Sequence, residues 1–246
     1  MKVSDVMTPR VISVDPGGMI RDAIRLMLQN HISGLPVIDA TGHLVGIVTE
    51  GDFLRRAETG TGRKRPRWLE FLISPGRLAD EYVHTHGRKV EEVMTPDPVT
   101  VMEDASLDEV VGIMERRRIK RLPVVRGGKV VGIVSRANLL HALAGLGRGL
   151  PRPTKDDARI RGQILDEIDK QSWVSTHLVN VIVRNGVVEL WGTIFDGKQG
   201  EALTVLAENV AGVERVEDHL TWFEPVSGMV IRAPDEDEGP ADAPRH

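Results

Sequence analysis

Two short patterns of hydroxyl and carboxylate or amide residues stand where binding chemistry is possible. Thr49 and Asp52 lie three residues apart, directly after the apolar run Val45 to Val48, and Ser135 and Asn138 repeat this spacing after a second such run. If each run is a strand followed by a helix, Thr49 stands at the helix start, where free backbone N–H groups and the helix dipole favour an anion. Asp52 in the first turn can accept hydrogen bonds from hydroxyl groups. The same Thr-x-x-acid pattern is also typical of a pair that only caps a helix, so both interpretations stay open.

The elements that must position these residues occur twice in the chain. Three spaced motifs align between the copies: Val3 to Pro9 with Val90 to Pro96, Leu35 to Val37 with Leu122 to Val124, and Val45 to Val48 with Val131 to Val134. The apolar periodicity predicts strand, helix, strand, strand, helix in each copy, with the first strand over residues 11–14. One copy of about 50 residues buries little core alone, so the two are expected to pack as one body. A site on the seam between them then exists in two versions.

The rest of the chain differs from these repeats. We predict a first repeat over residues 1–58, an apolar helical insert over 59–87 and a second repeat over 88–146. Residues 147–153 are rich in glycine, proline and arginine, which predicts a linker between parts that fold independently. The pattern beyond it predicts helix, strand, strand, helix, strand over 154–224, with Asn185-Gly186 as the hairpin turn. The acidic, proline-containing residues 225–246 are expected to be disordered. The fold class is therefore α+β.

The repeated motifs resemble the cystathionine-β-synthase (CBS) domain, here as a tandem pair. The resemblance covers residues 1–58 and 88–145. The C-terminal part resembles a BON domain through its Asn185-Gly186 hairpin, Leu190-Trp191-Gly192 and the segment Gly212 to Val216. For the CBS pair the resemblance implies a regulatory module that binds an adenine nucleotide in the cleft between the copies, with phosphate near Thr49 and ribose near Asp52. It implies a first site of Thr49, Asp52, Thr100, Lys120 and Arg121, and a weaker second cleft of Ser13, Ser135 and Asn138. Where the second copy has Lys120-Arg121, the first has Ser33-Gly34 and lacks the basic pair.

Composition and the remaining motifs narrow the function further. The chain has no cysteine and a formal net charge of -4, so thiolate chemistry and cysteine metal sites are excluded and nucleic-acid binding is not expected. The sequence shows no nucleophile elbow, P-loop lysine or dinucleotide fingerprint, so we expect no enzyme. The basic run between Arg55 and Arg67 is interpreted as a solvated segment rather than a nucleic-acid contact. His84 and His86 could supply two metal ligands, but no carboxylate or further histidine stands at a suitable spacing, so we expect no metal site.

The sequence therefore predicts a regulatory, non-enzymatic sensor of adenine nucleotides with a BON domain as output or docking module. AMP, ADP or ATP is the expected regulatory ligand, and no cofactor is required. We further expect a cytoplasmic homodimer with an unidentified protein target. The alternative is an envelope adaptor in which the BON domain docks to phospholipid or protein and the CBS pair is only a dimerisation scaffold. Membrane contact is possible in that case but is not favoured, since the C-terminal domain shows no basic stripe.

Overall fold

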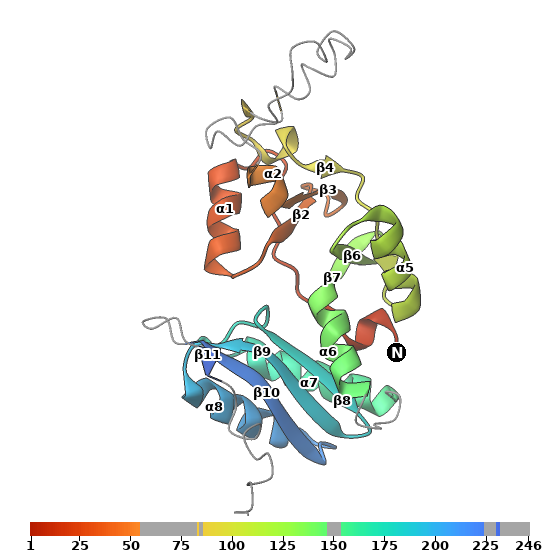
Figure 1. Ribbon diagram of the computed structural model, residues 1–246, viewed down its shortest axis with the longest axis vertical. Coiled ribbons are helices and arrows are strands. Elements are labelled where there is room, and N and C mark those ends of the chain that lie inside the picture. Colours follow the sequence, from red (N-terminus) through yellow and green to blue (C-terminus); the bar gives the residue numbers. More distant parts are fainter. Residues whose placement is uncertain (55–82, 84–85, 147–153, 224–229, 232–246) are drawn as a thin grey trace, which may run out of the picture. The chain divides into compact units, whose positions relative to one another are not determined.

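The computed structural model describes residues 1–54, 83, 86–146, 154–223 and 230–231 (Figure 1). Most of the predicted insert and most of the acidic tail lie outside these residues, as does the linker. The chain divides into two compact units, one of residues 9–134 and one of residues 1–8 with 135–246. None of the helices among the described residues combines the length and apolar character that a membrane crossing requires.

The unit of residues 9–134 contains the body of both repeats. Its first repeat has helix α1 (Ile20–Gln29), strands β2 (Gly34–Ile38) and β3 (Leu44–Thr49), and helix α2 (Glu50–Leu54). Its second has the 3-10 helix η3 (Val90–Glu92), strands β4 (Thr95–Pro96) and β5 (Val101–Met102), helix α5 (Leu107–Arg117), and strands β6 (Arg121–Arg126) and β7 (Lys129–Ser135). Strand β1 (Thr8–Pro9) precedes them. The sheets have the orders β2-β3-β4 and β1-β7-β6-β5.

The two repeats exchange short segments, which joins them into one body. Strand β4 of the second repeat pairs antiparallel with β3 of the first, with Ile47 opposite Thr95. Val90 and Val93 of the second repeat are fully buried in the core of the first, among Leu35 and Val48. The second repeat thus packs Val90 and Val93 into the core of the first, and the Thr95-Pro96 pair extends the sheet of the first repeat. The prediction that the repeats pack together is confirmed.

The predicted strand over residues 11–14 is wrong. Only Val14 pairs, as an isolated parallel bridge to Val37, with its N–H donating to Pro36 O at 3.0 Å. To extend this parallel pairing toward Ile12, the backbone N–H of residue 36 would have to donate to the carbonyl oxygen of Ile12. Proline has none, so the ladder ends there.

The second unit contains the BON-like part. Its elements are η1 (Val3–Asp5), α6 (Arg136–Leu146), α7 (Lys155–Asp169), β8 (Val179–Arg184), β9 (Val187–Ile194), α8 (Gly197–Glu208), β10 (Arg215–Phe223) and β11 (Val230–Ile231). The sheet order is β11-β10-β9-β8. Strands β8 and β9 are antiparallel around Asn185 and Gly186, whose positive φ angles of 51° and 75° fit a tight hairpin turn. Strands β9 and β10 are parallel.

The predicted order helix, strand, strand, helix, strand is confirmed, with one correction. Val230–Ile231 pairs antiparallel with Trp222 and Phe223, although the tail from residue 225 was expected to be disordered. A two-residue apolar strand adds to the open edge of β10, and the acidic composition around it hides this signal. Helices α7 and α8 cover one face of the sheet with an apolar core that includes Ile164, Leu203 and Leu190.

Candidate functional site

Thr49 and Asp52 lie at the junction of β3 and α2, which follow each other without a loop. Oδ2 of Asp52 accepts hydrogen bonds from the Thr49 backbone N–H at 2.8 Å and from Thr49 Oγ1 at 2.9 Å. The Glu50 N–H donates to Ser33 O at 3.2 Å, which ties the helix start to the residue before β2. These bonds form one half of a capping box, which supports the capping interpretation. It does not exclude binding, because both side chains are only partly buried and only one carboxylate oxygen of Asp52 is used within the described residues.

Arg121, the first residue of β6 in the second repeat, reaches this junction. Its Nη2 donates to Ser33 Oγ at 2.5 Å, and a Cβ on Gly34 would collide with its Nη1. Glycine at position 34 therefore provides the space that the guanidinium occupies. Arg121 and Gly34 are equivalent positions of the two repeats, so the pseudo-symmetry brings one copy's basic residue onto the other copy's glycine.

The charge of Arg121 faces the acceptors of the first repeat. Burial lowers the pKa of Arg121, and the carboxylates of Glu50 and Asp52 act in the opposite direction. The side chain is partly buried, and its Nη1 is a buried donor with no hydrogen-bond partner in the part of the chain that the structure describes. A cation with an unused donor thus lies beside a hydroxyl and two carboxylates. This arrangement suits a ligand that carries both an anionic group and hydroxyl groups.

The other residues predicted for this site are not joined to it by contacts. Thr100 is partly buried directly before β5, and Lys120 is exposed before β6. No hydrogen bond or ion pair among the described residues connects either one to Thr49 or Asp52. Sequence reasoning missed Ser33 and Glu50 as neighbours of the guanidinium. The signal available was the alignment of Ser33-Gly34 with Lys120-Arg121.

Ser135 and Asn138 form the same hydrogen bonds as Thr49 and Asp52, but the Asn138 amide makes additional bonds to the protein. Oδ1 of Asn138 accepts from the Ser135 N–H at 2.9 Å and from Ser135 Oγ at 2.7 Å, as Asp52 does in the first copy. Its Nδ2 donates to Val6 O at 2.9 Å and to Thr8 Oγ1 at 3.3 Å. Asn138 is 5% exposed, so its amide is already occupied by protein groups. Ser13, predicted for this cleft, belongs to the other unit, where it is partly buried.

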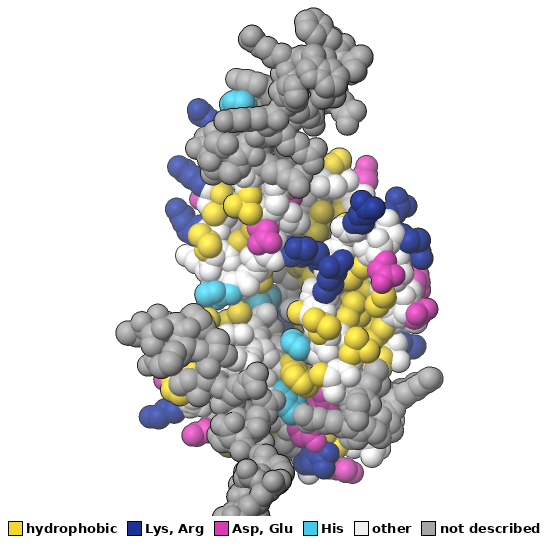
Figure 2. All heavy atoms as spheres, in the orientation of Figure 1, with side chains coloured by type: hydrophobic (Ala, Val, Ile, Leu, Met, Phe, Trp, Pro, Cys, Tyr) yellow, Lys and Arg dark blue, Asp and Glu magenta, His cyan; other side chains and the backbone are white. Residues whose placement is uncertain are grey.

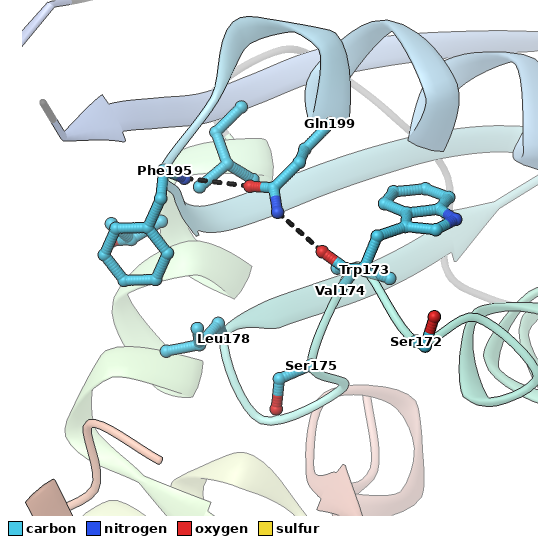
Figure 3. Close-up of a pocket in the computed structure, with 9 residues that line it drawn as sticks. Ser172, Trp173, Val174, Ser175, Leu178, Phe195 and Gln199 are labelled. Atoms are coloured by element: carbon cyan, nitrogen blue, oxygen red, sulfur yellow. Dashed lines mark hydrogen bonds between the residues drawn. The ribbon is translucent and has the colours of Figure 1, made fainter. Parts of the chain in front are cut away.

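Two further features of the described chain offer no chemistry of this kind. His84 of the predicted histidine pair lies outside the described residues, and those described contain no cluster of histidine and carboxylate groups that could hold a metal ion. A pocket of about 240 Å³ opens in the second unit at the start of α8 (Figure 3). There Gln199 accepts from the Phe195 N–H at 2.9 Å and donates to Trp173 O at 2.6 Å. The pocket has no charged lining residue, being formed by Ser172, Trp173, Val174, Ser175, Leu178, Thr193, Ile194, Phe195 and Gln199.

Comparison with known proteins identifies the parts of the chain. Residues 3–58 and 90–145 match the CBS domain, and residues 156–222 match the BON domain. The chain is 31% identical over 154 residues to an uncharacterised protein of Methanocaldococcus jannaschii. This alignment covers 58% of this chain and 91% of that protein. The chain belongs to the CBS domain family. Its tandem CBS pair is followed by a BON domain, as the resemblance implied.

Relatives from plants match a little more than half of the chain. The chain is 32% identical over 153 residues to the chloroplastic CBS domain-containing protein CBSX2 of Arabidopsis thaliana and 34% identical over 139 residues to CBSX1 of the same plant. These matches span 57% and 52% of this chain, and 62% and 57% of the two relatives. The crystal structure of CBSX2 in complex with AMP aligns with a TM-score of 0.51 at 32% identity, over 58% of this chain and 97% of that one.

Proposed function

We propose that this CBS–BON protein is a regulatory, non-enzymatic sensor that binds an adenine nucleotide at Thr49, Asp52 and Arg121. The observation that carries the proposal is the position of Arg121. Its guanidinium crosses from the second repeat to the first and presents a buried Nη1 donor without a partner among the described residues, beside the Thr49–Asp52 pair. A buried donor of this kind is costly unless a ligand or water satisfies it.

The chemistry of the three side chains supports a nucleoside phosphate. The guanidinium is suited to phosphate oxygens, and the partly exposed carboxylate of Asp52 accepts hydrogen bonds from ribose hydroxyls. CBSX2, whose CBS pair is 32% identical to this one, was crystallised in complex with AMP. AMP, ADP and ATP are therefore the first ligands to test, with Thr100 and Lys120 as further candidate contacts.

The second cleft is proposed to be weak or empty. The amide of Asn138 is held by Val6 O and Thr8 Oγ1, and its single oxygen is held by Ser135. A ribose that used this side chain would have to break these bonds. We therefore propose one tight site per chain, with Ser13, Ser135 and Asn138 forming at most a weak one.

The roles of the BON domain and of assembly follow as proposals. The BON domain is the output or docking module. The homodimer stays a prediction, and exposed apolar side chains on α6 support it: Leu140 is 64% exposed and Leu143 60%. Figure 2 shows hydrophobic side chains gathered on the surface over α6. The cytoplasmic location and the unidentified protein target also stay predictions.

A ligand panel on the full-length protein tests the proposed function. Thermal shift with AMP, ADP, ATP, S-adenosylmethionine, NAD and cyclic dinucleotides should show one adenine nucleotide that stabilises the fold, by about 2.7 kcal/mol at 100 times its Kd. Asp52→Ala should abolish the shift. A flat panel, together with sedimentation of the protein with anionic phospholipid vesicles, would instead favour the adaptor function.

A further inference from the structure

The BON sheet has two buried faces of opposite character. Along β8, Val179, Val181 and Val183 belong to the apolar core under α7 and α8. The alternate residues Asn180, Ile182 and Arg184 are on the opposite face, and they are 7%, 0% and 0% exposed. Three residues of the neighbouring strands also contribute to the contacts of this second face: Glu189 and Trp191 of β9 and His219 of β10. The second face is therefore polar and charged but covered.

The cover comes from the CBS pair, chiefly from α6. Arg184 Nη2 donates to Ala142 O at 2.9 Å, and Asn180 Nδ2 lies 3.4 Å from His141 Nδ1. The His141 ring stacks on Trp191 with 5.3 Å between ring centroids, and Trp191 contacts His219 on its sheet neighbour at 4.3 Å. All these residues lie in one compact unit, in which α6 runs beside β8 (Figure 1).

A second cation ties the BON domain to the chain's first residues. Arg161 of α7 is 7% exposed; its Nε donates to Val181 O at 2.7 Å, while Nη1 and Nη2 donate to Ser4 O at 3.2 Å and Met7 O at 2.6 Å. Burial lowers the pKa of Arg161 to about 10, against the effect of Asp5, which leaves the guanidinium charged at neutral pH. The parts on either side of the 147–153 linker therefore contact each other, and their independent folding stays a prediction.

The polar face lacks the features of a permanent core. Arg184 and Glu189 approach to 3.5 Å with side chains 1% exposed. Nη1 of Arg184 and Oε1 of Glu189 are the two atoms of this ion pair and make no hydrogen bond within the described residues, and Nε of Arg184 has no hydrogen-bond partner there. Buried charges with unused polar atoms cost free energy that an apolar face would not, whereas water satisfies them when the face opens. Polar contacts of this kind are typical of domain interfaces that move.

The covering helix is directly connected to the nucleotide-binding side of the CBS pair. Strand β7 ends at Ser135 and α6 begins at Arg136, without a loop. One of the two sheet neighbours of β7 is β6, whose first residue is Arg121. A ligand that engages the guanidinium acts on β6, and β7 carries any shift into the first turn of α6.

We propose that helix α6 is a reversible cover over the polar face of the BON sheet, and that ligand at the Thr49–Asp52 site changes how often this cover opens. The second half of this proposal rests on the proposed function. The first half does not, because it concerns the free protein. The open state exposes the charged side chains of Arg184 and Glu189 together with the Trp191 ring, and this makes the BON domain the output that the CBS pair controls.

Thiol labelling of the full-length protein tests the cover, since the chain has no cysteine of its own. Ile182→Cys places a thiol on the covered polar face, and Val181→Cys places one on the adjacent residue in the apolar core; both positions are 0% exposed. Opening of the cover exposes only residue 182, while global unfolding exposes both. Each rate is divided by the rate of the same variant in denaturant, which removes differences in thiol reactivity.

We expect Cys labelling at position 182 to be at least about tenfold faster than at position 181, as local opening costs less than global unfolding. Ala142→Leu, which overfills the contact and destabilises the closed state, should accelerate labelling at 182 further. Equal rates at the two positions, or an unchanged rate at 182 in Ala142→Leu, would overturn the reversible cover.

The same two variants test control by ligand. Saturating AMP should change the rate at 182 by about threefold or more, in either direction, whereas the rate at 181 should only fall as the ligand stabilises the whole fold. An unchanged labelling rate at 182, while calorimetry shows that AMP is bound, would overturn the control of the cover by ligand but not the cover itself. If calorimetry shows no binding of AMP, ADP or ATP, the proposed function fails and the ligand-controlled half falls with it. The comparison of 182 with 181 still decides whether the cover opens.

Discussion

Replacement of Arg121 by methionine gives the sharpest test of how the site recognises phosphate. Methionine fills much of the space over Gly34 without a charge, and it removes the buried Nη1 donor and the bond from Nη2 to Ser33 Oγ. AMP binding should weaken strongly. Adenosine, which has no phosphate, should bind the variant about as well as it binds the native protein.

The magnitude follows from the contacts of the guanidinium. Nη2 is used by Ser33, so Nη1 is the donor left for one charge-assisted bond to phosphate, worth about 1.5–3 kcal/mol. Without the cation, the carboxylates of Glu50 and Asp52, whose charges act on Arg121, repel the phosphate. The loss should therefore fall toward the upper end of a range of about 10- to 150-fold in Kd.

Isothermal titration of AMP and adenosine into native protein, Arg121→Met and Lys120→Met measures this effect. Lys120→Met is the comparison, because it removes the other candidate cation, which is exposed and has no described contact with Thr49 or Asp52. It should change the AMP affinity by less than about threefold, as expected for an exposed charge. An Arg121→Met variant that keeps the native ratio of AMP to adenosine affinity would refute phosphate recognition by Arg121. Equal loss of both ligands would show that Arg121 only supports the fold.

Three further predictions concern stability. Asn138→Ala leaves Val6 O without its donor, so it should lower the free energy of unfolding, measured in urea, by about 1–3 kcal/mol. The AMP affinity should barely change. An unchanged stability with weaker AMP binding would show that Asn138 binds the ligand. Asp157→Asn should destabilise the BON domain by a similar amount of about 1–3 kcal/mol, since its carboxylate accepts from the Thr154 and Gly186 N–H groups at 2.6 and 2.9 Å; an unchanged melting temperature would contradict this. Burial lowers the pKa of His141, and also that of His177 against the effect of Asp169, so the unfolded chain binds more protons and stability should fall as the pH drops below about 6.5. The variant with both histidines changed to glutamine should lose less stability over that range, and equal losses would refute the assignment.

Much of the fold could be predicted because its signals are local. The doubled motifs predicted a packed pair, and Asn185-Gly186 predicted a hairpin whose two positive φ angles are observed. The spacing of Thr49 and Asp52 predicted the cap. The prediction failed where strand pairing depends on a residue that is distant in the sequence. The missing N–H of Pro36 ends the ladder that residues 11–14 would have needed.

The candidate site was predicted in residue types but not in its contacts. The sequence shows arginine at 121 and glycine at 34 in equivalent positions, yet only the packed pair shows that one fills the space left by the other. Asn138 was interpreted as a poorer version of Asp52, whereas its amide serves as a donor to Val6 O. Charged residues that alternate with valines along β8 and β9 are typical of a solvent-facing side of a sheet, so the cover over Arg184 and Glu189 was not foreseen.

Calorimetric titration of AMP into the full-length protein and into Asp52→Asn tests the central claim most directly. Asparagine keeps the shape of the cap but loses the charge and one of the two acceptor oxygens. The account predicts one tight AMP site per chain in the native protein, and an affinity about 10- to 100-fold lower in Asp52→Asn, with the fold intact by circular dichroism. Two equivalent sites per chain, or native affinity in Asp52→Asn, would contradict it.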